Sequence, residues 1–166
     1  MSESAKVCIG GEWSDGGLGS YEIINPATEQ VVGLAPNCSV EQSIAATEAA
    51  REAFDSWSRT TPEHRANLLN AAADLYDARR DEFVPLVQAE TGATMRVAKT
   101  MQVPQVSARL RRYATGAMES RLIPLEPAIT GTTPLAPGGI MSAVVHRAPV
   151  GVVSCITSYN FPVTNM

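Results

Sequence analysis

The chain has 166 residues, with 45% hydrophobic and 18% charged side chains and a formal net charge of −4. This length suits one domain, or one domain and part of a second, and the composition excludes gross disorder. The mild acidity, without a run of Lys or Arg, argues against nucleic acid or an anionic membrane as the main partner. Because the sequence has neither an apolar secretory signal nor a run long enough to cross a bilayer, we expect a soluble, cytoplasmic protein.

The cysteines and histidines are too scattered to indicate a metal centre. Cys8, Cys38 and Cys155 form no C-x-x-C pair, and His64 and His146 stand far apart in the sequence. We therefore expect no zinc site and no disulfide framework, but reduced thiols and no bound metal.

Short strands joined by turns are predicted up to about residue 38, at 7–9, 12–13, 21–24 and 31–34. Gly10 and Gly11 separate the first two strands and favour a tight hairpin, because glycine accepts positive φ at little steric cost. Gly17 and Gly19 are not a dinucleotide-binding fingerprint, since the third glycine and the following helix are missing.

Helical periodicity begins after Ser39, which forms a predicted capping box with Gln42. The apolar side of this first helix is predicted to consist of Val40, Ile44, Ala50, Phe54 and Trp57. A second helix is predicted to start at Thr61 and Pro62, with proline at the first helical position. Its predicted buried face consists of Leu68, Ala72, Leu75 and Tyr76.

Two more helices are predicted from about 81 to 91 and from 94 to about 117. Gly92 is the expected stop of the third helix, and Pro85 requires that helix either to hold it in the first turn or to start later. Pro104 is expected to kink the fourth helix. The basic cluster Arg109, Arg111 and Arg112 is compatible with an anion site, but a solvated face is favoured because the three do not share one side.

Residues 121–146 contain prolines and glycines that exclude a helix, and 140–145 alternate as a strand does. We predict a long hairpin or arm over this segment. His146 could in principle be catalytic, but its position in a strand beside Arg147 favours a structural role.

The last part of the chain carries the clearest chemical signal. Residues 149–156 form an apolar run typical of a parallel strand buried on both faces. Small polar residues follow it, where open α/β sheets bind ligands. A parallel strand needs a crossover and a partner strand, so we expect the sequence to begin a second domain without completing it. Cys155 lies in this run and is predicted to be a packing residue rather than a nucleophile, because buried thiols react weakly.

Residues 148–162 read A-P-V-G-V-V-S-C-I-T-S-Y-N-F-P. They resemble the start of the nucleotide-binding domain in the aldehyde dehydrogenase superfamily, whose usual form there is P-x-G-V-x-x-x-I-x-P-W-N-F-P. The resemblance continues upstream, in the same order, through IGGEW at 9–13, INPAT at 24–28, AFDSW at 53–57 and ETG at 90–92. Each piece is weak by itself, but five in register indicate the N-terminal third of such a protein.

The resemblance implies an α/β fold in three parts. Residues 1–120 would supply strands and helices of the cofactor-binding domain, 121–147 an oligomerisation β arm, and 148–166 the first strand and turn of an incomplete Rossmann-like core. It also implies NAD or NADP as cofactor, a small-molecule aldehyde as substrate, and a homodimer or homotetramer at full length.

The resemblance also implies roles for six residues at the end of the chain. Asn160 matches the asparagine whose amide helps to form the oxyanion hole, and Phe161 matches a residue that lines the substrate tunnel. The implied cofactor contacts are Ile156, Thr157, Ser158 and Tyr159. Ser158 and Tyr159 depart from the family pattern, which has proline and tryptophan at these positions, and such changes affect substrate preference.

In this family a cysteine nucleophile, a glutamate base and a ribose-binding lysine come later in the chain, and none has a counterpart here. The implied function is the N-terminal portion of an NAD(P)-dependent aldehyde dehydrogenase that oxidises an aldehyde to a carboxylic acid through a cysteine thioester. The 166-residue chain alone is then expected to be inactive. Two alternatives stay open: a non-catalytic assembly or interaction fragment, and a CoA-acylating member of the superfamily.

Overall fold

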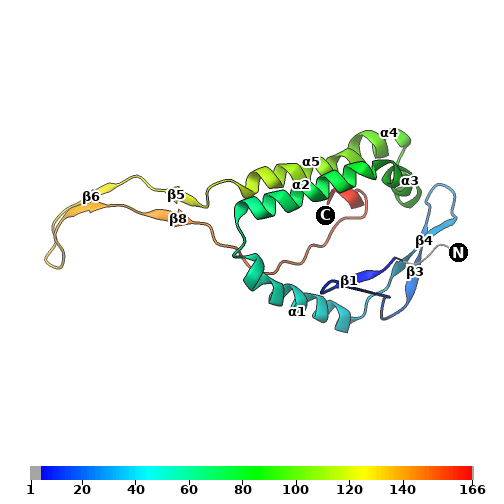
Figure 1. Ribbon diagram of the computed structural model, residues 1–166, viewed down its shortest axis with the longest axis horizontal. Helices are drawn as coiled ribbons and strands as arrows, with labels where there is room; N and C mark the ends of the chain where they lie inside the picture. Colours follow the sequence, from blue (N-terminus) through cyan, green and yellow to red (C-terminus); the bar gives the residue numbers. More distant parts are fainter. Residues whose placement is uncertain (1–4, 166) are drawn as a thin grey trace.

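A computed structural model describes residues 5–165 of the chain. Figure 1 shows an elongated molecule with small hairpins at one end, helices in the middle, and a long hairpin that projects from the other end. Beyond this hairpin the chain returns beside the helices and ends next to helix α5 (Val103–Ala117). The combination of helices and short strands confirms the predicted α/β class. None of the helices in the described range is long and apolar enough to span a membrane.

The four predicted N-terminal strands are present as two antiparallel hairpins. Strand β1 (Val7–Ile9) pairs with β2 (Glu12–Ser14), and β3 (Ser20–Ile24) pairs with β4 (Val31–Pro36). Gly10 and Gly11 connect the first pair with φ of 61° and 90°. Both values lie in the left-handed region, so the glycine pair makes the tight turn that the sequence predicts.

Helix α1 (Val40–Trp57) begins at the predicted capping box. Ser39 Oγ accepts a hydrogen bond from the Gln42 backbone N–H at 3.3 Å, and Gln42 Oε1 accepts one from the Ser39 N–H at 3.1 Å. The Gln42 side chain also accepts from the Gly17 N–H and donates to the Asp15 carbonyl, which fixes the preceding turn. The predicted apolar side is not buried in this structure, since α1 has no buried residue. The reason is that α1 packs on strand β1 over a short length and stands apart from the other helices (Figure 1).

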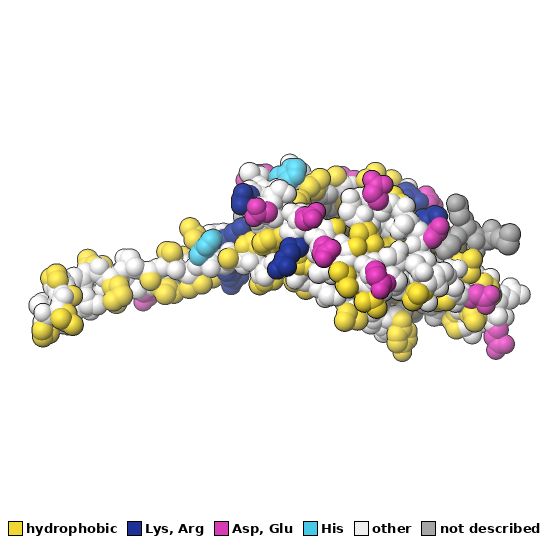
Figure 2. Space-filling view, turned by 90° about the horizontal axis from the view of Figure 1, so that it is seen from below, with side chains coloured by type: hydrophobic (Ala, Val, Ile, Leu, Met, Phe, Trp, Pro, Cys, Tyr) yellow, Lys and Arg dark blue, Asp and Glu magenta, His cyan; other side chains and the backbone are white. Residues whose placement is uncertain are grey.

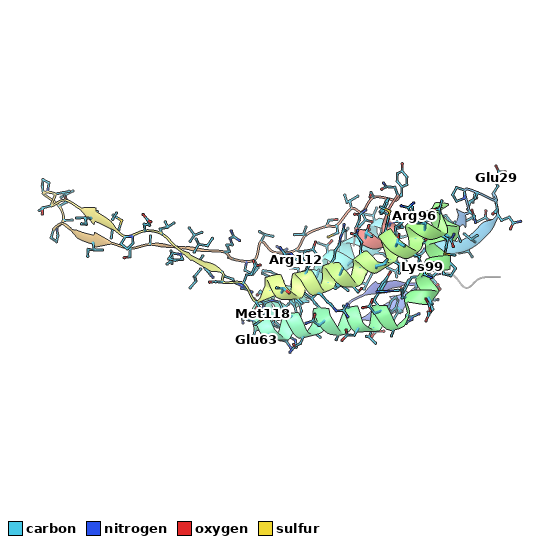
Figure 3. All side chains as sticks on the ribbon, turned by 90° about the horizontal axis from the view of Figure 1, so that it is seen from above. Glu29, Glu63, Arg96, Lys99, Arg112 and Met118 are labelled. Carbon is cyan, nitrogen blue, oxygen red and sulfur yellow. The ribbon has the colours of Figure 1, made fainter. Side chains whose placement is uncertain are left out.

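Helix α2 (Pro62–Ala78) starts at the predicted cap, where Thr61 Oγ1 accepts from the His64 N–H at 3.2 Å. It packs antiparallel to α5, as the positions of Glu63 and Met118 at the same end of the pair show (Figure 3). The predicted buried face is wrong, because Leu68 and Leu75 are exposed. Ala66 and Ala73 are buried instead. Small side chains on this face let the two helix backbones approach closely.

Helix α3 (Arg80–Thr91) follows α2 after a single residue, Arg79, and ends at Gly92 as predicted. Gly92 has φ of 68°, and its N–H donates to the Gln88 carbonyl at 2.9 Å. Both alternatives expected for Pro85 are wrong, because the helix starts at Arg80 and continues through Pro85 beyond its first turn. Burial of Val84 and Val87 on either side of this proline stabilises the helix against the lost hydrogen bond.

The predicted fourth helix is interrupted where the proline requires it. A short helix α4 (Met95–Val97) leads into a π-helical turn, Ala98–Gln102, and then into α5. The Val103 N–H donates to the Ala98 carbonyl, five residues back. The disturbance predicted at Pro104 therefore takes the form of a wider turn just before it, which avoids crowding between the proline ring and the preceding turn.

The core lies where α3, the π-helical turn and α5 meet. Its buried residues are Val84, Val87, Ala98 and Val103. Tyr76 and Phe83 stack beside it with ring centroids 4.4 Å apart. Val163, near the end of the described chain, packs against the same cluster. The core thus joins the helices to the segment for which the sequence predicts functional residues.

The predicted long hairpin is present. Strand β5 (Leu122–Pro124) pairs with β8 (Val144–His146), and β6 (Ala128–Thr130) pairs with β7 (Gly139–Met141). Figure 1 shows this arm projecting well beyond the helices.

The buried parallel strand predicted over 149–156 is not formed. These residues are extended but pair with no strand in the described part of the chain. Ile156 is 95% exposed and Cys155 is exposed, so the prediction that Cys155 is a packing residue is also wrong. Without a neighbouring strand, the backbone lacks ladder partners and the apolar side chains have no surface to cover them.

Candidate functional site

The residues with implied roles lie on and just before one compact turn, residues 158–165. A 3-10 turn, Pro162–Thr164, forms its second half. Within it the Phe161 carbonyl accepts two hydrogen bonds from Thr164, from the N–H at 3.1 Å and from Oγ1 at 3.0 Å. Asn165 Nδ2 donates to Ser158 Oγ at 2.7 Å and links the two ends of the turn. We call residues 158–165 the Asn160 turn.

Helix α5 contacts the second half of the Asn160 turn. The Arg109 guanidinium donates a hydrogen bond to the Thr164 carbonyl, and Thr164 is only 3% exposed. A cavity of about 240 Å³ lies between α5 and the turn. Its lining residues are Val106, Arg109, Leu110, Tyr113, Val163 and Thr164. The turn is therefore docked on the helix by both polar and apolar contacts.

Asn160 itself is exposed, and its side chain hydrogen-bonds to none of the described residues. Its amide N–H groups are therefore available to an oxygen outside the turn. Phe161 is half-buried, whereas Tyr159 is 92% exposed. The structure gathers these side chains at one turn but does not enclose them in a pocket.

The four residues with implied cofactor contacts, Ile156 to Tyr159, are all exposed. The Thr157 hydroxyl and the Tyr159 ring are exposed and engaged by none of the described residues, while the Ser158 hydroxyl accepts from Asn165. A hydroxyl, an aromatic face and an exposed backbone can hydrogen-bond and stack against a dinucleotide. No group of three His, Cys, Asp or Glu side chains suited to a metal occurs between residues 5 and 165.

The three arginines of α5 have separate partners, so they do not form one anion site. Arg111 pairs with Asp74 at 2.6 Å and Asp77 at 2.8 Å on helix α2. Arg112 is exposed and approaches Glu119 at 3.9 Å. All three arginines are exposed, as the predicted solvated face requires, although Arg109 and Arg111 also contact other elements. The contact of Arg109 with Thr164 was not predicted, because the two residues are 55 positions apart and no local sequence signal marks such a contact.

Asp77 is the centre of the ionic contacts between α2 and α5. It accepts from Arg80 at 2.7 Å and from Arg111 at 2.8 Å. The pKa of the Asp77 carboxyl lies below its ordinary value, because the Ser107 hydroxyl first, and then the Arg111 and Arg80 guanidinium groups, stabilise its anion. The carboxylate thus fixes α5, and with it Arg109, against α2.

We expect Asp77 to contribute to the stability of the fold in a pH-dependent way. Since its folded pKa is depressed, this stability is present above the ordinary value of 3.8 and is lost as the pH falls through the lower folded pKa. Asp77→Asn should lower the melting temperature at neutral pH and reduce the further loss below pH 3.8. Circular dichroism melts from pH 2 to 7 measure both effects. Asp81→Asn is the control, because Asp81 pairs with no described cation; equal curves for the two variants would contradict the prediction.

His146 lies on strand β8 of the arm, apart from the Asn160 turn (Figure 1). Cys155 is exposed, and no described histidine or carboxylate lies within hydrogen-bond distance of its Sγ. The described residues therefore provide no base that would activate the Cys155 thiol.

Comparison with known proteins gives a consistent family. Residues 13–166 match the model of the aldehyde dehydrogenase family. The chain is 33% identical to the 3-succinoylsemialdehyde-pyridine dehydrogenase of a Pseudomonas species over 100% of its own length and 32% of that protein. It is also 33% identical to human 2-aminomuconic semialdehyde dehydrogenase, over 87% of the chain and 27% of that protein. The chain thus spans about a third of the length of these curated relatives.

Solved structures give the same result. The betaine aldehyde dehydrogenase of Staphylococcus aureus, solved in complex with NAD⁺, matches with a TM-score of 0.67 and 26% identity over 72% of this chain and 24% of that one. An indole-3-acetaldehyde dehydrogenase matches in fold with a TM-score of 0.78, over 99% of this chain and 36% of that one.

Proposed function

The chain belongs to the aldehyde dehydrogenase family, and from this premise we propose that it forms the N-terminal part of an NAD(P)-dependent enzyme that oxidises an aldehyde to a carboxylic acid. The observation that carries the proposal is the Asn160 turn, which presents an uncommitted amide donor at a fixed place beside helix α5. The family match over residues 13–166 supports it.

In this proposal Asn160 acts as a catalytic residue. Attack of a cysteine thiolate, supplied by the enzyme outside these residues, on the aldehyde carbon converts the carbonyl oxygen to an oxyanion. An amide N–H held at hydrogen-bond distance stabilises that charge more than it stabilises the neutral carbonyl, which lowers the barrier. When bound, the nicotinamide cofactor would accept the hydride that leaves this carbon, and water would hydrolyse the resulting cysteine thioester to the acid and the free thiol.

The neighbouring residues bind and orient in this proposal. Ile156, Thr157, Ser158 and Tyr159 form one wall of the cofactor site, and half-buried Phe161 lines the approach of the substrate. The exposure of Thr157 and Tyr159 in this chain supports the proposal, since both are open to a ligand. The test is an aldehyde screen of the complete enzyme with NAD and with NADP, and failure to reduce either cofactor with any aldehyde would reject the oxidative function.

We expect the isolated 166-residue chain to show no aldehyde-dependent reduction of NAD or NADP. The reason is that nothing in the described range activates Cys155, and Cys8 and Cys38 lie on strand β1 and just after strand β4, outside the Asn160 turn. Absorbance at the wavelength of the reduced cofactor measures this. Turnover that disappears in a Cys155→Ser variant would contradict the expectation.

The projecting arm favours a second role in assembly, which fits either the enzyme or a non-catalytic assembly fragment. Figure 2 shows hydrophobic side chains along the whole arm and few charged ones. Among them Ile129 is 90% and Leu135 98% exposed. We propose that the arm joins copies of the protein into a homodimer or homotetramer, since extended apolar strands exposed to water associate.

We expect the double variant Ile129→Lys/Ile140→Lys to lower the oligomeric state of the complete enzyme, because two charges would replace exposed apolar contacts on paired strands β6 and β7. Size-exclusion chromatography with light scattering measures the mass. Leu18→Lys is the matched control, since Leu18 is also exposed but lies off the arm. An unchanged mass in the arm variant would rule out this role.

A further inference from the structure

An oxyanion donor is effective only if its position is fixed before the reaction, and the Asn160 side chain is not fixed by contacts of its own. The turn that carries it follows the exposed, unpaired segment 149–157. Within the described chain, the position of the Asn160 side chain therefore depends on contacts made by the other residues of the turn.

The first constraint on the position of the turn is its contact with Arg109 of helix α5. Its guanidinium donates to the Thr164 carbonyl, and Thr164 in turn donates twice to the Phe161 carbonyl, next to Asn160. Arg109 lies in the middle of α5, which the Arg111 ion pairs fix to α2. A series of polar contacts, part-buried at Arg109 and Thr164 and exposed at Arg111, thus connects the helix pair to the residue that follows Asn160.

The second constraint is a hydrogen bond between the two ends of the turn. Asn165 Nδ2 donates to Ser158 Oγ at 2.7 Å and closes the loop of residues that contains Asn160. In the family pattern that the chain resembles, proline occupies the position of Ser158, and its ring would restrict the backbone directly. Serine leaves the backbone more freedom, so the hydrogen bond from Asn165 supplies a restriction in its place.

We propose that Arg109 and Asn165 are positioning residues that hold the Asn160 turn in its catalytic geometry. The inference rests on the proposed function of Asn160. Neither residue contacts the reacting atoms. Each acts through the turn, Arg109 at the Thr164 carbonyl and Asn165 at the Ser158 hydroxyl.

The test compares three variants of the complete enzyme. Arg109→Met removes the donors and keeps a long side chain, Arg109→Lys keeps one donor, and Arg112→Met is the matched control three residues along α5, where the side chain is exposed (Figure 3). We expect Arg109→Met to lower kcat by roughly tenfold to a hundredfold, with the KM of the cofactor changed less than about twofold. Arg109→Lys should recover most of kcat, and Arg112→Met should retain it.

A double-mutant cycle distinguishes positioning from a general structural effect. If Arg109 acts through Asn160, Arg109→Met should lower kcat in the wild-type enzyme but cause little further loss in the Asn160→Ala enzyme. An equal loss in both backgrounds would overturn the inference. Asn165→Ala gives the same test at an exposed position, so the inference stays testable if Arg109→Met fails to fold.

The outcomes also separate this inference from the proposed function. If Asn160→Ala leaves kcat unchanged, Asn160 is not the oxyanion donor, and both proposals fail. If Asn160→Ala lowers kcat while Arg109→Met and Asn165→Ala do not, the proposed function stands and the positioning inference alone is wrong.

Discussion

Replacing Asn160 by alanine in the complete enzyme is expected to lower kcat by about 10²–10³-fold, the range found when a single oxyanion-hole donor is removed. The affinity for the cofactor should change little, because the amide would contact the oxyanion and not the dinucleotide. Stability should also change little, since the side chain is exposed and hydrogen-bonds to none of the described residues.

Steady-state kinetics with a saturating cofactor measure the effect, and a cofactor titration by fluorescence measures binding. Asn70→Ala, at an exposed position on helix α2, is the control for replacing an asparagine. Asn160→Asp should be at least as damaging as alanine, because a carboxylate would repel the oxyanion. Wild-type turnover in Asn160→Ala would remove Asn160 from the mechanism.

The contrast between Asn160 and Arg109 shows what a sequence can predict about such a site. A role for Asn160 was predicted because residues 148–162 resemble the aldehyde dehydrogenase pattern, which has an asparagine at this position. Arg109 was not found, because its partner carbonyl at Thr164 is brought to it only by the docking of the turn on α5. Contacts between residues far apart in the sequence depend on tertiary packing, which no local pattern encodes.

In the fold, too, local features were predicted correctly and features that depend on tertiary packing were not. The capping box at Ser39, the glycine turn at Gly10 and Gly11 and the helix stop at Gly92 were predicted correctly, since each depends on residues a few positions away. The buried face of α2 was predicted wrongly, because the packing partner α5 selected alanines rather than the larger Leu68 and Leu75. The strand predicted over 149–156 was wrong for the same reason, because a strand forms only where another strand pairs with it.

The second large effect is expected at Gly92, where helix α3 ends in a left-handed conformation. With φ of 68° a side chain is strained there, at about 1–2 kcal/mol for a non-glycine residue. A Cβ would also lie 2.7 Å from Pro26 Cγ, on the connection between strands β3 and β4. We expect Gly92→Ala to destabilise the protein by about 2 kcal/mol or more, which lowers the melting temperature by roughly 4–8 °C.

Two further variants separate the causes. In the Gly92→Ala background, Pro26→Ala should recover the part due to the close contact and leave the part due to positive φ. Gly116→Ala in helix α5 is the matched control, because its Cβ would lie 3.7 Å from the Arg112 guanidinium, an ordinary contact. Gly116 lies in the last turn of α5 without a positive φ, so that change should stabilise by about 0.4–1 kcal/mol through the unfolded state. Equal melting temperatures for Gly92→Ala and Gly116→Ala would show that the end of α3 does not depend on a left-handed residue. They would also show that the close approach of Gly92 to Pro26 does not contribute to stability.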